Sequence, residues 1–286
     1  MAGLLQFGCR PAAEPEDPVA PHYTDAATLA AVARHPDLSE IHRDLALLCP
    51  PQPGATHRLA TARCSVSQID GQGQLKPLDI ESVLSVQRFD DQHVMVSTPD
   101  LHLQMLAADG TASHVASGVI DPRVADDGRH VAWVELVETA TTYEGGAATQ
   151  IVLWDAAADE RWVVSDDTSD SSPVPVPGRP EVVVISRRSG LASYWLLGPQ
   201  REPTQLTNVG LARGDEGFAP LHAGEFIWLT DGRAAVYSAD YGEPELWRLD
   251  LDEPGARMLG PGRLPMLARN GVVAVTGHGD DVQVVE

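Results

Sequence analysis

The side chains that could do chemistry are scattered along this sequence and form no recognisable catalytic motif. It contains neither the Gly-x-Ser-x-Gly of a serine hydrolase, nor the His-Glu-x-x-His of a zinc peptidase, nor a phosphate-binding P-loop. Of its ten histidines, His93 and His102 flank one expected hairpin and could hold a metal ion, although strand or turn positions are the ordinary interpretation. We therefore assign no catalytic, cofactor-binding or metal-binding residue, and we expect no cofactor and no enzymatic activity.

Two acidic turns and one long loop are the remaining candidates for a binding element. Residues 166–170 contain three aspartates, and Asp280 and Asp281 fall in a later turn. Calcium prefers such oxygen ligands, but the spacing differs from that of the EF-hand loop, so we expect solvated turns. The segment 137–149 is longer than an ordinary hairpin turn. Long loops often carry function, which makes this segment the first candidate, with a tolerated insertion as the alternative.

The three cysteines bear on where the protein resides. None has the C-x-x-C spacing of a zinc or redox site, and Cys49 and Cys64 could form a disulfide that leaves Cys9 over. A short apolar stretch ends in Gly8-Cys9 and resembles the end of a bacterial lipoprotein signal. We predict that residues 1–21 are a signal remnant or flexible tether with Cys9 as the lipid-attachment residue. The alternative is a disordered N-terminus with a free thiol.

The charge balance limits the classes of partner. Acidic residues number 41 against 20 basic ones in a chain of 286, which gives a formal charge of −21. Phosphate backbones and anionic lipid should repel such a protein, so nucleic acid is not an expected partner. No apolar run reaches the roughly 18 residues of a membrane span, so any membrane attachment would be by lipid. We expect a monomer that binds a protein or another component of the cell envelope.

Residues 22–56 predict a short helical segment that packs on the main domain. Asp25 precedes a run of helix formers and could be an N-cap. Apolar residues then recur at a spacing of three to four: Leu38, Ile41, Leu45 and Leu48. Prolines at positions 50, 51 and 53 end any helix there.

An internal repeat is the strongest signal in the sequence. A strand–turn–strand unit recurs in residues 122–133, 173–185, 228–238 and 265–275. A strand centred on an aromatic pair or on Leu-Trp follows the first three copies, at Trp154, Trp195 and Trp247, and a polar fourth strand comes next. Residues 83–116 form an earlier copy without the tryptophan. Short strands repeated at about forty to fifty residues predict a β-propeller made of four-stranded sheets, or blades.

The physical reason for the repeat is that one blade cannot bury both of its faces alone. Blades stacked around an axis bury them against one another, and closing the ring protects the strand edges. We assign the propeller to residues 57–286. If residues 57–79 and 262–286 share one blade that closes the ring, the count is five, which we favour; if they belong to separate blades, the count is six.

The repeat resembles that of TolB-like and prolyl-oligopeptidase-type propellers. Those repeats combine Ser-Pro-Asp-Gly-Lys/Arg, an apolar strand, Ser-Asp-x-x-Gly, Leu-Trp and Leu-Thr. The best copy here comprises Trp228-Leu-Thr-Asp-Gly-Arg233, Tyr237-Ser-Ala-Asp-Tyr-Gly242 and Glu245-Leu-Trp247. The next comprises Ile185-Ser-Arg-Arg-Ser-Gly190, Tyr194-Trp195 and Gln205-Leu-Thr207. The resemblance covers roughly residues 80–286 and implies a non-enzymatic binding or scaffold module, periplasmic or outer-membrane-associated. The alternatives are a cytoplasmic location, and a propeller hydrolase or lyase with an acidic site in the central channel.

The lipid on Cys9 is directly testable. Mass spectrometry of the N-terminus of protein purified from its source should find Cys9 modified by lipid, and an unmodified Cys9 would refute this assignment. Thiol titration of the denatured protein adds a second measurement. One free thiol or none is expected if Cys49 and Cys64 are bonded, whereas three free thiols would support the cytoplasmic alternative.

Overall fold

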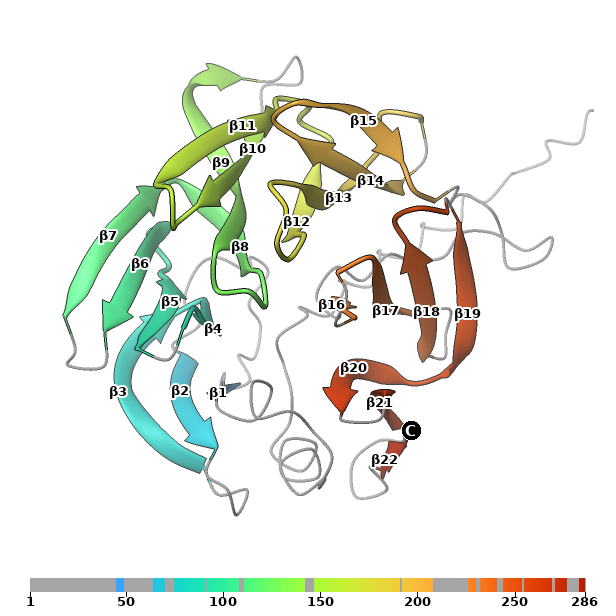
Figure 1. The fold of residues 1–286 in the computed structure, drawn as a ribbon. Helices are drawn as coiled ribbons and strands as arrows, with labels where there is room; N and C mark the ends of the chain where they lie inside the picture. Colours follow the sequence, from blue (N-terminus) through green and yellow to red (C-terminus); the bar gives the residue numbers. More distant parts are fainter. Residues whose placement is uncertain are drawn as a thin grey trace, which may run out of the picture.

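The computed structural model describes residues 45–48, 64–69, 75–90, 92–107, 111–141, 147–190, 192–207, 226–229, 232–240, 244–253, 255–268, 271–276 and 283–285. The described residues form six antiparallel sheets, which follow one another around a common centre in chain order (Figure 1). The first strand of each four-stranded sheet lies nearest that centre and the fourth lies outermost. Within the described part of the chain, no helix is long and apolar enough to cross a membrane.

We number the sheets in chain order. Sheet 1 contains β1 (Leu45–Leu48), β2 (Cys64–Ile69) and β3 (Leu75–Val83), and sheet 2 contains β4 (Ser85–Arg88), β5 (His93–Ser97), β6 (His102–Ala107) and β7 (Ala112–Ser117). Sheet 3 contains β8 (Val119–Val124), β9 (His130–Thr141), β10 (Ala147–Asp155) and β11 (Glu160–Ser165), and sheet 4 contains β12 (Ser171–Pro175), β13 (Val182–Ser186), β14 (Ser193–Gly198) and β15 (Arg201–Gln205). Sheet 5 contains β16 (Phe226–Trp228), β17 (Ala234–Asp240), β18 (Pro244–Asp250) and β19 (Ala256–Pro261), and sheet 6 contains β20 (Arg263–Ala268), β21 (Gly271–Thr276) and β22 (Gln283–Val285).

This arrangement confirms an all-β propeller, and each repeat copy found in the sequence coincides with one sheet. The described strands make six sheets, so the favoured count of five is replaced by the alternative of six. The expected closing blade shared by the two ends is not formed among the described strands, because sheets 1 and 6 each pair only within themselves. Strand β1, which the sequence analysis did not expect, pairs with β2 and completes sheet 1 as a three-stranded sheet of its own.

Residues 45–48 correct one part of the helical prediction. They form strand β1, with Leu45 opposite Gln68 and Leu48 opposite Ser65 of β2. The Leu-Ala-Leu-Leu sequence has high helix propensity, but pairing with a neighbouring strand overrides a preference of a few tenths of a kcal/mol per residue. The remainder of segment 22–56 and residues 1–21 lie outside the described residues.

Burial on both faces explains why the strands read as continuous apolar runs. In β9, Val131 and Trp133 face sheet 2 and pack with Met95 and Leu103. The alternate residues of β9, such as Val134, face sheet 4 in a second cluster. Equivalent clusters join sheet 4 to sheet 5 and sheet 5 to sheet 6. Each central strand of sheets 3, 4 and 5 therefore contributes to two interfaces, as the period of two in strand geometry requires.

The turn between the first two strands of a sheet contacts the preceding sheet closely. Gly128 has a φ of +63°, and a Cβ built there would lie 2.3 Å from the carbonyl oxygen of Phe89 in sheet 2. Gly232 repeats the arrangement against Pro177 in sheet 4. These glycines combine the left-handed backbone of a tight turn with the absence of a side chain at a backbone contact.

A partly buried polar network links sheet 3 to sheet 4. The Asp127 carboxylate accepts hydrogen bonds from the Nδ1 of His130 at 2.9 Å and from the backbone N–H of Gly178 at 2.6 Å. The backbone N–H groups of Arg129 and His130 bind its other oxygen. Partial burial alone would raise the pKa of Asp127, but these hydrogen bonds outweigh burial and lower the pKa to about 2. The ionised carboxylate only accepts, so the Nδ1 of His130 carries the proton.

We predict that Asp127→Asn lowers the free energy of unfolding by about 1–3 kcal/mol at neutral pH, because the charged acceptor of several hydrogen bonds is lost. The carboxyl has a lower pKa in the folded than in the unfolded state, so its stabilisation is present above about pH 4 and declines as pH falls towards 2. The Asp127 side chain is 21% exposed, so this pH-dependent part should be on the order of 1 kcal/mol.

Urea denaturation at several pH values checks this prediction. The difference between wild type and Asp127→Asn should shrink below about pH 4. Asp166→Asn, in the exposed turn after β11, is the control and should change stability by less than about 0.5 kcal/mol. A wild-type advantage that persisted undiminished at pH 2.5 would contradict the assigned role of the carboxylate.

Candidate functional site

The inner strands of sheets 3, 4 and 6 share an irregularity next to a proline. The pairing of β8 with β9 shifts register between Ile120 and Arg123, and Asp121 in the shifted segment has a φ of +47°. In β12 the shift lies between Ser171 and Val174, with Ser172 at +52° and Pro173 following it. In β20 it spans Pro265. Proline has no N–H to donate, so it suits a bulge where the regular ladder is interrupted.

Gln87 satisfies the backbone groups that the bulge in β8 leaves outside the ladder. Its Nε2 donates to the carbonyl oxygen of Pro122 at 2.5 Å, and its Oε1 accepts from the N–H of Val124 at 2.9 Å. One side-chain amide thus replaces a short piece of β-ladder between the inner strands of sheets 2 and 3. A similar side-chain-to-backbone bond joins sheets 5 and 4, where the Nε1 of Trp228 donates to the carbonyl oxygen of Pro175 at 2.8 Å.

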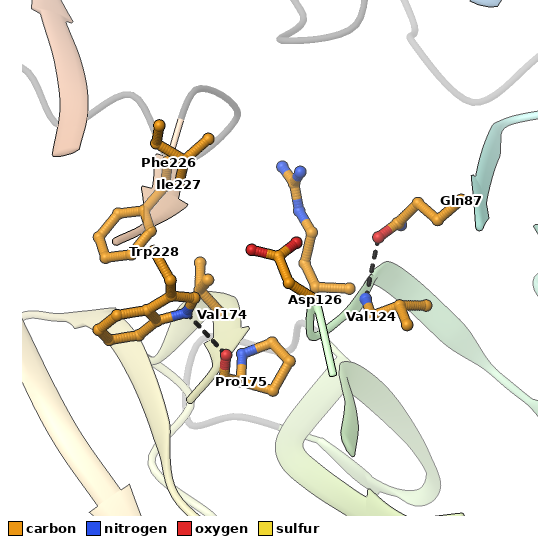
Figure 2. Close-up of a pocket in the computed structure, with 9 residues that line it drawn as sticks. Gln87, Val124, Asp126, Val174, Pro175, Phe226, Ile227 and Trp228 are labelled. Atoms are coloured by element: carbon orange, nitrogen blue, oxygen red, sulfur yellow. Dashed lines mark hydrogen bonds between the residues drawn. The ribbon is translucent and has the colours of Figure 1, made fainter. Parts of the chain in front are cut away.

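The inner strands of sheets 2, 3, 4 and 5 surround a central cavity of about 230 Å³. Figure 2 shows the labelled side chains around it, with Gln87 and Trp228 on opposite sides. Strands from four sheets contribute its lining: Gln87, Arg123, Val124, Asp126, Val174, Pro175, Phe226, Ile227 and Trp228. Most of these side chains are aliphatic or aromatic, and the lining includes one cation and one acid. Such a surface suits an apolar group with an attached polar or charged group.

The wall formed by sheets 4 and 5 is a rigid aromatic cluster. The rings of Tyr194 and Tyr237 meet edge to face with centroids 5.0 Å apart, and Tyr194 meets Phe226 at 5.6 Å. Phe226 also meets Trp228 edge to face at 5.3 Å. Burial raises the pKa of Tyr194 well above its usual value, so this phenol remains neutral. Close packing of this kind holds Phe226 and Trp228 in place before any ligand arrives.

Comparison with solved structures identifies the fold. The chain is similar to TolB from Acinetobacter baumannii, with a TM-score of 0.58 and 16% sequence identity over 86% of this chain and 61% of that one. The chain has the TolB-like β-propeller fold. It is also similar to an oligogalacturonate lyase from Vibrio parahaemolyticus, with a TM-score of 0.56 and 11% identity over 85% of this chain and 72% of that one. A further match is the β-propeller domain of the trilobed protease from Pyrococcus furiosus, with a TM-score of 0.50 and 9% identity over 84% and 76% of the two chains.

These similarities establish the TolB-like fold and no more than the fold, since every identity is low. The chain spans about three fifths of the length of the TolB structure. No protein-family model matches the sequence, and no curated protein matches it. What the cavity does must therefore be argued from its own residues.

The histidine pair considered from the sequence does not form. His93 opens β5 and lies opposite Ala107, whereas His102 opens β6 at the other end of the same hairpin. The Nδ1 of His93 instead lies 2.9 Å from the Asp90 carboxylate. Strand pairing explains the separation, because the first residues of two antiparallel strands are at opposite ends.

The acidic turn 166–170 is occupied by internal contacts. The Asp167 carboxylate accepts from the backbone N–H of Ser169 at 2.9 Å, which lowers the pKa of Asp167. Asp170 is buried and forms an ion pair with Arg188. Its side chain therefore points into the sheet 4 region while Asp166 remains exposed. Among the described residues, no group of three or more His, Cys, Asp or Glu side chains is arranged to hold a metal ion.

The segment 137–149 is mostly strand instead of loop. Strand β9 continues to Thr141, and β10 begins at Ala147, so the two form a long hairpin (Figure 1). The β-branched and small residues of this segment are compatible with strand pairing. The sequence analysis interpreted the segment as a loop because it is longer than an ordinary hairpin turn. Residues Cys9, Cys49, Asp280 and Asp281 lie outside the described residues, and Cys64 lies on β2.

Sequence analysis did not single out Gln87, Arg123 or Trp228 as cavity residues. The available signal was the proline at the start of three of the repeat copies, such as Pro122, which marks the inner strand and hence the neighbourhood of the axis. Which side chains of that strand face the centre depends on the bulge, and the sequence does not specify the register shift.

We predict that Gln87→Glu lowers the free energy of unfolding by about 1–3 kcal/mol, because a carboxylate cannot donate to the Pro122 carbonyl and repels it. Gln87→Leu should be similarly destabilising, since it leaves two partly buried backbone groups without their partner. Urea denaturation measures both changes. Gln200→Glu, in an exposed turn, serves as the control, and equal effects at positions 87 and 200 would argue against the bridging role.

Proposed function

We propose that this TolB-like propeller is a non-enzymatic binding module that receives an extended segment or chain end of another protein at its central cavity. The observation that carries the proposal is the composition of the cavity wall. Aromatic and aliphatic side chains such as Phe226, Ile227 and Trp228 lie beside the charged groups of Arg123 and Asp126. A peptide offers both an apolar side chain for the wall and polar backbone or terminal groups for the charges.

The size of the cavity supports a macromolecular ligand. Its volume of about 230 Å³ is below the roughly 300–1,000 Å³ of pockets that enclose a drug-sized molecule. The cavity has room for one or two side chains, so most of the ligand would lie outside it. Preorganised aromatic walls suit such an anchoring contact because they lose little conformational entropy on binding.

The charge of the chain favours a basic partner. With a formal charge of −21, the protein should attract a positively charged segment and accelerate its association at low ionic strength. We therefore propose a segment that carries an apolar anchor residue flanked by Lys or Arg. The proposed setting is the bacterial cell envelope, with lipid attachment at Cys9 as the means of retention there.

An enzyme remains the second candidate, because one of the structures with this fold is described as an oligogalacturonate lyase. A hydrolase or lyase would use acidic residues in the channel as general acids or bases. Asp126 is the one acid among the described residues of the cavity lining. The binding proposal is preferred because six of the nine lining residues are aliphatic or aromatic and only one is an acid.

Peptide binding tests the proposal. A library of fluorescent peptides, each with one apolar residue flanked by basic residues, should yield ligands by fluorescence anisotropy at low salt. Asp126→Arg should weaken the best ligand at least about tenfold, since it replaces attraction by repulsion. Asp126→Asn should weaken it less, by roughly threefold.

The matched control is Asp166→Arg, which makes the same charge change in an exposed turn after β11 and should leave binding nearly unchanged. Equal losses in the two Arg variants would mean that general charge, not the cavity, governs binding. Cleavage of oligogalacturonate by the wild type, abolished in Asp126→Asn, would instead support the lyase candidate.

A further inference from the structure

Two histidines on the outer strands of sheet 2 converge on one serine hydroxyl. The Oγ of Ser117 lies 3.4 Å from the Nδ1 of His102 and 3.3 Å from the Nε2 of His114. The two imidazole rings meet edge to face with centroids 5.4 Å apart. All three side chains are accessible to solvent, and none lines the central cavity.

A β-bulge brings these side chains to the same face. Strand β7 pairs with β6 so that Ala116 lies opposite Leu103 and His114 opposite Gln104, which leaves Val115 as the extra residue. Val115 and Ala116 are consequently both buried, while His114 and Ser117 are both exposed. In a regular strand, residues three positions apart face opposite sides. The bulge therefore re-aims His114 towards the group formed by His102 and Ser117.

Asp100 lies beside the second ring nitrogen of His102. The Oγ1 of Thr98 donates to the Asp100 carboxylate at 2.5 Å. The Nε2 of His102 lies 3.5 Å from the same carboxylate. A carboxylate only accepts, so the His102 tautomer with its proton on Nε2 suits this position and leaves the lone pair of Nδ1 towards Ser117. In that tautomer Ser117 donates to His102 and accepts from the Nε2–H of His114.

We propose that His102 and His114 form a surface site for one first-row divalent cation such as Cu²⁺, Ni²⁺ or Zn²⁺. Imidazole nitrogen is a preferred ligand of these ions. On binding, His114 shifts its proton from Nε2 to Nδ1, so that both nitrogens direct lone pairs at the space beside Ser117. Because the side chains are exposed, rotation about their side-chain bonds would let both nitrogens approach one ion at the roughly 2.0–2.1 Å of a metal bond.

Asp100 is a positioning residue in this site, because it contacts the ligand His102 and does not itself bind the metal. A metal-binding histidine commonly donates its other N–H to a carboxylate, which fixes the tautomer and increases the basicity of the ligand. His102 has this relation to Asp100, and Thr98 fixes the carboxylate. The protein supplies two nitrogens, the Ser117 hydroxyl is within reach, and solvent completes the coordination. The site is therefore open to exchange and selects ions by their affinity for imidazole.

The test uses the full chain, freed of metal by a chelator and titrated with Ni²⁺ or Cu²⁺ by calorimetry. His102→Gln and His114→Gln should each remove one bound ion or weaken it at least tenfold. The double variant should lose no more than either single variant, because one ion needs both rings. Asp100→Asn should weaken binding by a smaller factor, up to about tenfold.

His93→Gln is the matched control. His93 is also a histidine of sheet 2 beside an aspartate, Asp90, but it lies at the far end of the hairpin and should not affect the titration. In a second measurement, paramagnetic Ni²⁺ should broaden the imidazole NMR signals of His102 and His114 together and before that of His93. Unchanged stoichiometry and affinity in both Gln variants, additive losses in the double variant, or earlier broadening of His93 would each overturn the proposal.

Discussion

The fold depends on one constraint: a four-stranded sheet with two apolar faces needs a neighbour on each side. The second and third strands of sheets 3, 4 and 5 place alternate residues in different clusters, as Val131 and Val134 of β9 do. Burial of this surface contributes about 25 cal/mol per Å² and is the main favourable term in folding. The sheets must therefore follow one another in a ring, and the ring brings their first strands together at a centre.

At the centre the constraint concerns hydrogen bonding, because each inner strand pairs with another strand along one edge only. Their other edge is a row of backbone groups that must find partners or face solvent. Bulges beside Pro122 and Pro173 interrupt the row, and side chains of adjacent sheets complete it, as Gln87 does for β8. The central cavity is what remains between these contacts, and its mixed aromatic and charged lining follows from the strands that reach it.

The outer strands have more freedom, since one of their edges has no role in packing between sheets. A bulge there changes which side chains share a face. In β7 it places His114 beside Ser117 and His102. The same backbone device thus has two consequences in this propeller: at the axis it shapes a cavity, and at the periphery it groups polar side chains on an exposed surface.

The sequence by itself determined the all-β class, the TolB-like repeat and the position of most strands, because burial on both faces imposes a regular apolar pattern on each copy. It did not determine the number of sheets, since Leu45–Leu48 has the local preferences of a helix and becomes β1 only by pairing. Nor did the sequence determine which polar side chains lie close together in the folded protein. His93 and His102 are close in sequence but apart in space, whereas Gln87 and Pro122 are distant in sequence and bonded. Register shifts and contacts between sheets decide such neighbours, and these arise only when the ring assembles.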